Sequence, residues 1–94
     1  MANIAGSGYM RWDTTTNAAF NGTYGPRNPR VKEIRMEVGA TGGLTTLQIG
    51  GKNFFSFVIP GEAMINLNYA PPQYMPGLAC TALGTNVVVT VVYE

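Results

Sequence analysis

The chain has 94 residues, the size of one domain, and its six basic and five acidic residues give a net charge of +1. Only 12% of the residues are charged and 46% are hydrophobic, so the composition argues against nucleic acid or an anionic membrane as partner. The chain has no histidine and one cysteine, which excludes an internal disulfide and a conventional zinc site. The low charge favours extra buried surface, and self-association is its simplest source.

Groups that could carry out catalysis are scarce. Without histidine, the usual base for a serine or cysteine nucleophile is missing. Cys80 lies in an apolar run, where a buried and inert thiol is expected. The glycine-rich stretches 39–43 and 50–52 lack the spacing of a phosphate-binding loop. We therefore expect no enzyme activity, no catalytic residue, no cofactor and no bound metal.

Two features of the sequence bear on where the protein folds. No segment is long and apolar enough to span a membrane. The N-terminus lacks the basic region and apolar stretch of a secretory signal. We expect the chain to be made and folded in a cytoplasm.

Residues 1–29 differ in composition from the rest and are rich in Gly, Asn, Thr and Ala. A disordered tail would not normally carry five large side chains, and this segment has Tyr9, Met10, Trp12, Phe20 and Tyr24. Either the segment packs onto its own domain, or it is an arm that packs onto something else. We treat it as an extended N-terminal arm. Its Asn21-Gly22 pair favours a tight hairpin turn.

Alternation of apolar and polar residues begins near residue 30. It predicts strands over residues 31–38, 44–49, 54–59 and 62–69, linked mostly by glycine-rich turns. Three prolines within residues 70–76 indicate an extended surface loop, and a short strand follows over 78–83. The expected core consists of Ile34, Met36, Leu47, Phe55, Phe57, Ile59, Ile65, Leu67, Val89 and Val91.

The last predicted strand, residues 86–94, is apolar on both faces. Val87, Val89, Val91 and Tyr93 point to one side, and Val88, Thr90 and Val92 to the other. An antiparallel strand with one face in water should alternate apolar and polar residues. Both faces of this strand must therefore be covered, either within a small sandwich or by a neighbouring subunit.

About six strands and no convincing helix predict an all-β fold. We expect a small antiparallel β-sandwich or jelly-roll-like domain over residues 30–94, preceded by the arm over 1–29.

Two binding functions can be considered from the residues alone. Four basic residues lie near Phe20 and Tyr24, namely Arg27, Arg30, Lys32 and Arg35, and such interleaving can bind single-stranded nucleic acid. Glu33 and Glu37 interrupt this patch, so nucleic acid is not the preferred partner. A small sugar-binding module remains an alternative, with Trp12, Tyr24, Tyr69 and Tyr74 as candidate contacts.

A basic strand at 31–38 is followed by Gly-Ala-Thr-Gly-Gly and a strand at 44–49, and residues 77–94 close the chain. This layout of residues 30–94 resembles small structural proteins of tailed bacteriophages. In particular the pattern is similar to capsid decoration (cement) proteins. The resemblance implies a non-enzymatic virion protein, assembled in the host bacterial cytoplasm and placed on the capsid surface. It implies a homotrimer that binds at junctions between major capsid subunits.

A mechanism follows as a hypothesis. The domain would self-associate through the outer face of the last strand, by Val88, Thr90 and Val92 or by the opposite set. The arm would grip the capsid, and its contact residues would be Tyr9, Trp12, Phe20, Tyr24, Arg27 and Arg30. Deletion of residues 1–24 should then leave a folded oligomer. Another virion part, such as a tail, neck or fibre-associated domain, is the alternative.

Overall fold

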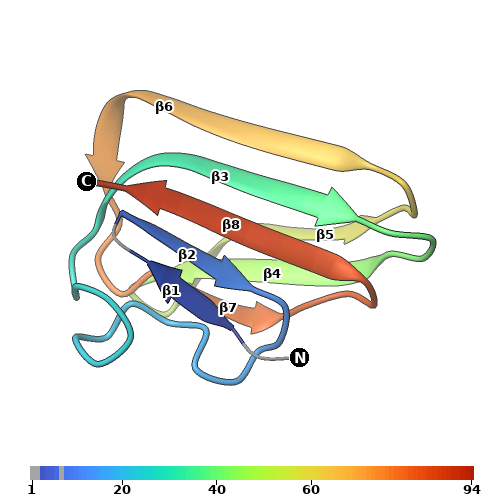
Figure 1. Cartoon of the computed structure of the whole chain (residues 1–94), viewed down its shortest axis with the longest axis horizontal. Coiled ribbons are helices and arrows are strands. Elements are labelled where there is room, and N and C mark those ends of the chain that lie inside the picture. The colour runs from blue at the N-terminus through green and yellow to red at the C-terminus, as the bar shows by residue number, and fades with distance from the viewer. Residues whose placement is uncertain (1–2, 7) are drawn as a thin grey trace.

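The computed structural model describes residues 3–6 and 8–94. These residues form eight strands and no helix. Figure 1 shows the strands in two layers, with a five-stranded sheet in front of a three-stranded one. The strands are β1 (Ile4–Gly6), β2 (Tyr9–Trp12), β3 (Arg30–Val38), β4 (Gly43–Ile49), β5 (Lys52–Ile59), β6 (Met64–Tyr74), β7 (Ala79–Ala82) and β8 (Val87–Tyr93).

The strand order is that of a jelly roll. The larger sheet runs β1-β2-β8-β3-β6 and the smaller one β5-β4-β7, with antiparallel pairing throughout. Ala19 adds a single antiparallel bridge to Ala79 on β7. A jelly roll has its first, eighth, third and sixth strands in one sheet and its second, seventh, fourth and fifth strands in the other. Here β2, β8, β3 and β6 correspond to the first set. The segment around Ala19, together with β7, β4 and β5, corresponds to the second set. The predicted fold class is confirmed.

The last strand, β8, is central in the larger sheet, where it pairs with β2 on one side and β3 on the other. Val87, Val89 and Val91 face the second sheet and are buried, whereas Val88, Thr90 and Val92 face outward and are half-buried. Branched side chains favour the pleated backbone. The strand therefore has one face in the core and the other among outward side chains of its neighbours.

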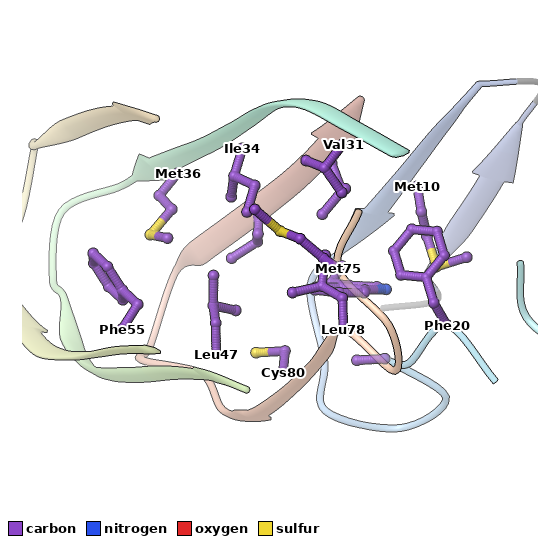
Figure 2. Packing of buried hydrophobic residues seen from close by; sticks show 14 of the residues in the cluster. Met10, Phe20, Val31, Ile34, Met36, Leu47, Phe55, Met75, Leu78 and Cys80 are labelled. Carbon is purple, nitrogen blue, oxygen red and sulfur yellow. The ribbon is translucent and has the colours of Figure 1, made fainter. Parts of the chain in front are cut away.

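The core lies between the two sheets, and Figure 2 shows Met36, Ile34, Val31 and Leu47 pointing into this space. An aromatic group continues it beneath β2 and β8. The rings of Trp12 and Phe20 meet edge to face at 5.8 Å, and those of Phe20 and Tyr93 at 5.1 Å. Such aromatic pairs add stability beyond the burial of their area.

The N-terminal segment is not a separate arm, and this corrects the predicted boundary at residue 29. β2 pairs with β8, and Trp12 and Phe20 are fully buried in the core. The amide of Phe20 donates to the carbonyl of Leu78 at 2.8 Å, and that of Cys80 to the carbonyl of Ala18 at 2.8 Å. The described part of the segment belongs to the sandwich because it supplies part of its core.

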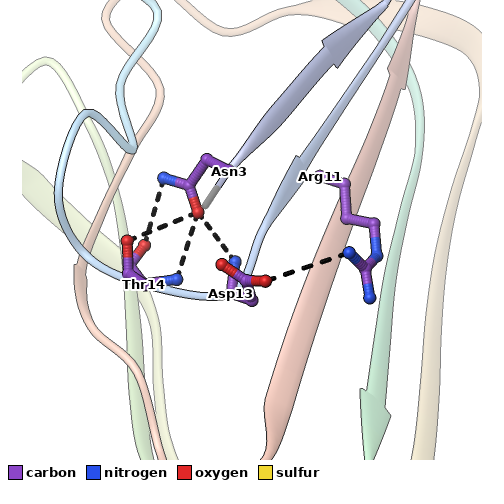
Figure 3. Close-up of polar contacts among 4 residues, drawn as sticks. All are labelled: Asn3, Arg11, Asp13 and Thr14. Atoms are coloured by element: carbon purple, nitrogen blue, oxygen red, sulfur yellow. Dashed lines mark hydrogen bonds and ion pairs between the residues drawn. The ribbon is translucent and has the colours of Figure 1, made fainter. Parts of the chain in front are cut away.

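Asn3 fastens the start of β1 to the turn that follows β2 (Figure 3). Its side-chain oxygen accepts from the amides of Asp13 at 2.9 Å and Thr14 at 3.1 Å. Its side-chain nitrogen donates to the carbonyl of Thr16 at 2.6 Å. The side chain of Asn3 therefore makes hydrogen bonds to three backbone groups that have no partner in a strand.

Three local predictions are wrong. Residues 70–74 are part of β6 rather than a loop, because β6 is an edge strand and there Pro71 and Pro72 remove no essential ladder bond. Asn21 and Gly22 form a turn closed by the amide of Gly22 and the carbonyl of Gly25 at 2.9 Å, with no flanking strands and hence no hairpin. Phe57 on the edge strand β5 is 60% exposed instead of lying in the core, whereas Phe55 and Ile59 on the same strand are buried.

Candidate assembly surface

The two lateral sides of the sandwich differ in the length of their edge strands and in how those strands are covered. On one side lie the edge strands β1 and β7, and residues 13–20 run between them. Asn3 binds this segment at β1, and the Ala19 bridge binds it at β7. We call this the closed side. Its edge strands are short, with three and four residues, so little unpaired backbone is left.

On the opposite side lie the edge strands β5 and β6, with eight and eleven residues. The chain passes from Ile59 to Met64 in one short turn, which keeps both strands at the same side (Figure 1). In the described chain no strand pairs with the outer edge of either one. Both edges therefore present unpaired backbone groups, except at Pro71 and Pro72 of β6, which have no amide hydrogen to donate.

Exposed apolar side chains are found mainly on the strands at and next to this side. Eight large hydrophobic residues are exposed among the described ones, and six of them lie on β4, β5 and β6. Val58 is 75% exposed and Met64 is 68% exposed. We call the two free edges and these six residues the open side, and its side chains are Leu44, Phe54, Phe57, Val58, Met64 and Tyr74.

The open side also lacks the charges that usually protect sheet edges. β6 has no charged residue in its whole length, and Lys52 is the only one in β5. Natural edge strands are commonly shortened, charged or covered, which prevents pairing with other chains. Exposed apolar side chains next to free sheet edges favour an interaction site.

The outer face of β8, predicted as the oligomer interface, has a different character. Thr90 lies in register between Arg11 on β2 and Arg35 on β3. Val92 and Val88 have Glu33 and Glu37 as partners on β3. The three outward residues of β8 form a narrow stripe with charged residues on both sides. Their contact with another chain stays a prediction, and the open side is the larger apolar surface.

The predicted capsid contacts fall into two groups. Trp12 and Phe20 are fully buried and cannot touch a partner in this fold, so their assignment as contacts is corrected. Tyr9 and Tyr24 are 41% and 39% exposed. Arg27 is exposed. The half-buried Arg30 forms an ion pair with Glu94 at 2.8 Å. These four remain available at the surface.

Two groups considered for chemistry, Glu33 and Cys80, lie in environments that do not activate them. Glu33 pairs with Arg35 at 3.3 Å on the outer face of the larger sheet. Burial raises the pKa of the Cys80 thiol to about 11, and its Sγ donates to the carbonyl of Ala82 at 3.3 Å. A protonated thiol is a poor nucleophile. Among residues 3–6 and 8–94, no group of three His, Cys, Asp or Glu side chains could hold a metal ion, and no helix could cross a membrane.

A shallow depression of about 620 Å³ lies where β3 and β6 lose register, and its lining includes Lys32, Glu33, Asn68 and Tyr69. Burial raises the pKa of Tyr69. Of the four aromatic residues considered for sugar binding, Tyr69 alone lines this depression, and Trp12 is buried in the core. The depression lacks a shared aromatic platform, so it does not favour the sugar-binding alternative.

Comparison of the chain with models of known protein families, with characterised proteins and with solved structures finds no match. The resemblance to capsid decoration proteins is therefore carried by the pattern of residues 30–94 alone. Sequence reasoning missed the open side. Residues 54–59 are mostly apolar and residues 63–74 are uncharged, but the sequence does not show which strands lie at sheet edges, because that depends on pairing between distant residues.

Proposed function

We propose that this protein is a non-enzymatic structural protein of a phage virion. It decorates the capsid and stabilises it by binding at junctions between major capsid subunits. The observation that carries the proposal is the open side: a well-packed domain leaves six large apolar side chains and two free sheet edges in water. Such a surface is expected to be covered in the functional state.

Two further observations support a structural role. The fold is a jelly roll, an architecture that recurs in viral capsid and lectin domains. Fold alone does not assign a function, so the virion part of the proposal is carried by the resemblance over residues 30–94. Cys80 is buried and protonated and Glu33 is paired with Arg35, so neither of these two residues is an activated nucleophile or base.

The proposed capsid contact is the loop of residues 21–29 together with Tyr9. Tyr24 and Arg27 are exposed in this loop. Aromatic and arginine side chains are enriched where proteins bind one another. The loop is held in place by Asn21, whose side-chain oxygen accepts from the amides of Thr23 at 2.9 Å and Tyr24 at 3.1 Å. A preformed loop loses less conformational entropy on binding.

Stabilisation of the shell would follow from mass action. A protein that binds only the assembled shell lowers the free energy of that state. At a free concentration of 100 times its Kd, one bound site contributes about 2.7 kcal/mol. Many sites on one shell would act together, which suits a small protein present in many copies.

The test uses capsids purified from the phage whose genome encodes this chain, stripped of the protein. We expect the chain to co-sediment with them at a saturable ratio and to raise the temperature at which they open. A Tyr24→Ala and Arg27→Glu double variant should fold normally, because both residues are exposed, and should bind more weakly. The control is Lys52→Glu, an equally exposed charge change on β5. Absence of saturable binding by the unchanged chain would refute the proposal.

A further inference from the structure

We infer that the open side is the place where a second copy of this chain docks, with an edge strand of one copy against an edge strand of the other. The inference rests on the proposed structural role, since both require the open side to be covered. It adds the identity of the partner. Self-association through the outer face of β8 would use a different surface, so the two locations can be separated by experiment.

The first argument is charge. The six exposed apolar residues of the open side are accompanied by no charged residue on β6, by Lys52 on β5 and by Glu62 in the turn between the two strands, so the charges of this side cancel. A partner with a charged face would have to lose water from its charges without gaining a counterion. A copy of the same surface brings almost no charge. The neutral open side is therefore complementary to itself.

The second argument is the backbone. β5 and β6 each have one strand neighbour, so each has a free edge. Both free edges lie at the same side because the turn from Ile59 to Met64 joins them directly. A second copy offers two edges of the same kind and similar length. Pairing of such edges satisfies donors and acceptors on both chains at once.

The third argument is the pattern along β6. Asn66 and Asn68 alternate with Ile65 and Leu67, and only the latter two pack partly against the core. Asparagine amides both donate and accept hydrogen bonds. When β6 of one copy lies beside β6 of another, the asparagine side chains can hydrogen-bond to each other and the apolar side chains can pack together. The strand can be covered without an unmatched group.

The alternative cover for the open side is the capsid subunit itself. That surface would have to be uncharged and to present its own free strand edge, whereas a second copy meets both requirements without further assumptions. The exposed Phe57, in edge-to-face contact with Phe55 at 4.9 Å, stands at the rim of the core where a docking chain would reach it. Continuity with the core is typical of subunit interfaces.

The experiment is the solution mass of the purified full chain, measured by light scattering over a range of micromolar concentrations without any capsid. We expect a mass above that of one chain, and a mass of one chain for Phe57→Lys. Since Phe57 touches Phe55, the second variant is Met64→Lys, which is 68% exposed and should not disturb folding. Circular dichroism and thermal unfolding check that each variant is folded.

The matched control is Thr90→Glu on the outer face of β8. A glutamate there lies between Arg11 and Arg35, so the fold should accept its charge. We expect this variant to keep the mass of the unchanged chain. A single-chain mass for the unchanged protein at every concentration would overturn the inference. Dissociation by Thr90→Glu, with no effect of Phe57→Lys or Met64→Lys, would also overturn it.

The two proposals fail separately. A chain that self-associates through the open side and binds no capsid keeps this inference and refutes capsid decoration. A chain that stays single in solution and binds capsids keeps capsid decoration and refutes the second copy as the occupant of the open side.

Discussion

The closed and open sides of this sandwich both end in sheet edges with unpaired backbone groups, but they differ in how those edges are covered. Each side ends in two sheet edges. On the closed side the edge strands are short, and residues 13–20 run between them with Phe20 inserted in the core. On the open side the strands are long and carry a single charged residue, Lys52, and the described chain supplies no segment to cover them.

The difference shows where the stability and the association of the protein should reside. On the closed side Ala18, Phe20 and Cys80 are buried, so loss of a large buried side chain such as Phe20 should reduce stability. Side chains of the open side are solvent-exposed in the single chain, so their loss should mainly reduce association. The same kind of substitution should therefore lower stability on the closed side and association on the open side. The predictions below test this difference between the two sides and the account of the fold from which it comes.

The largest effect is expected from deletion of residues 1–24. This deletion removes β2 from its pairing with β8 and takes Trp12 and Phe20 out of the core. The remaining chain should show no cooperative thermal transition by circular dichroism. A folded and cooperative truncated protein would mean that the closed side is an appended arm, as the sequence first indicated.

A matched pair of phenylalanines gives the next largest contrast. Phe20→Ala on the closed side should destabilise by about 3–5 kcal/mol, because it empties a fully buried site. Phe57→Ala on the open side should cost about 1 kcal/mol, mainly its contact with Phe55. Urea unfolding at low protein concentration measures both. Equal losses would remove the distinction between the two sides.

The pH dependence of stability tests how well the closed side excludes water around β7. Burial raises the pKa of Cys80 from 9.0 to about 11. A raised pKa stabilises the fold fully below the unfolded value, and the stabilisation is lost as pH rises through the folded value. The free energy of unfolding should fall between pH 9 and pH 11 more in the unchanged chain than in Cys80→Ala. Parallel profiles would show that water reaches the thiol.

The smallest effect is expected at the ion pair of Arg30 and Glu94, whose side chains are 39% and 43% exposed. Arg30→Ala should change the free energy of unfolding by at most about 1 kcal/mol. The change should shrink further at high salt. A larger, salt-independent loss would place Arg30 among the residues that hold the sheet together. Urea unfolding at two salt concentrations measures this.

The strands after residue 30 could be predicted because their alternation is regular and their turns are rich in glycine. Ile34 and Met36 read as one buried face, and both are buried. β1 and β2 were missed because they have three and four residues. The signal was present in β2, where buried Met10 and Trp12 alternate with Tyr9 and Arg11.

The open side could not be predicted because exposure there depends on strand order. Phe55 and Phe57 are alternate residues of one strand and point the same way, and the sequence does not distinguish them. Phe55 is 9% exposed and Phe57 is 60% exposed on the same edge strand, β5. Pairing partners far apart in the chain decide which strands lie at edges, and periodicity within one strand carries no information about them.

Hydrogen exchange of the backbone amides at rising protein concentration tests the central claim most directly. If a second copy covers the open side, exchange should slow at amides of β5 and β6 as concentration rises. Amides of β1, β7 and the interior strand β8 should be unaffected. Exchange that is independent of concentration in β5 and β6, or slowing confined to other strands, would contradict the account.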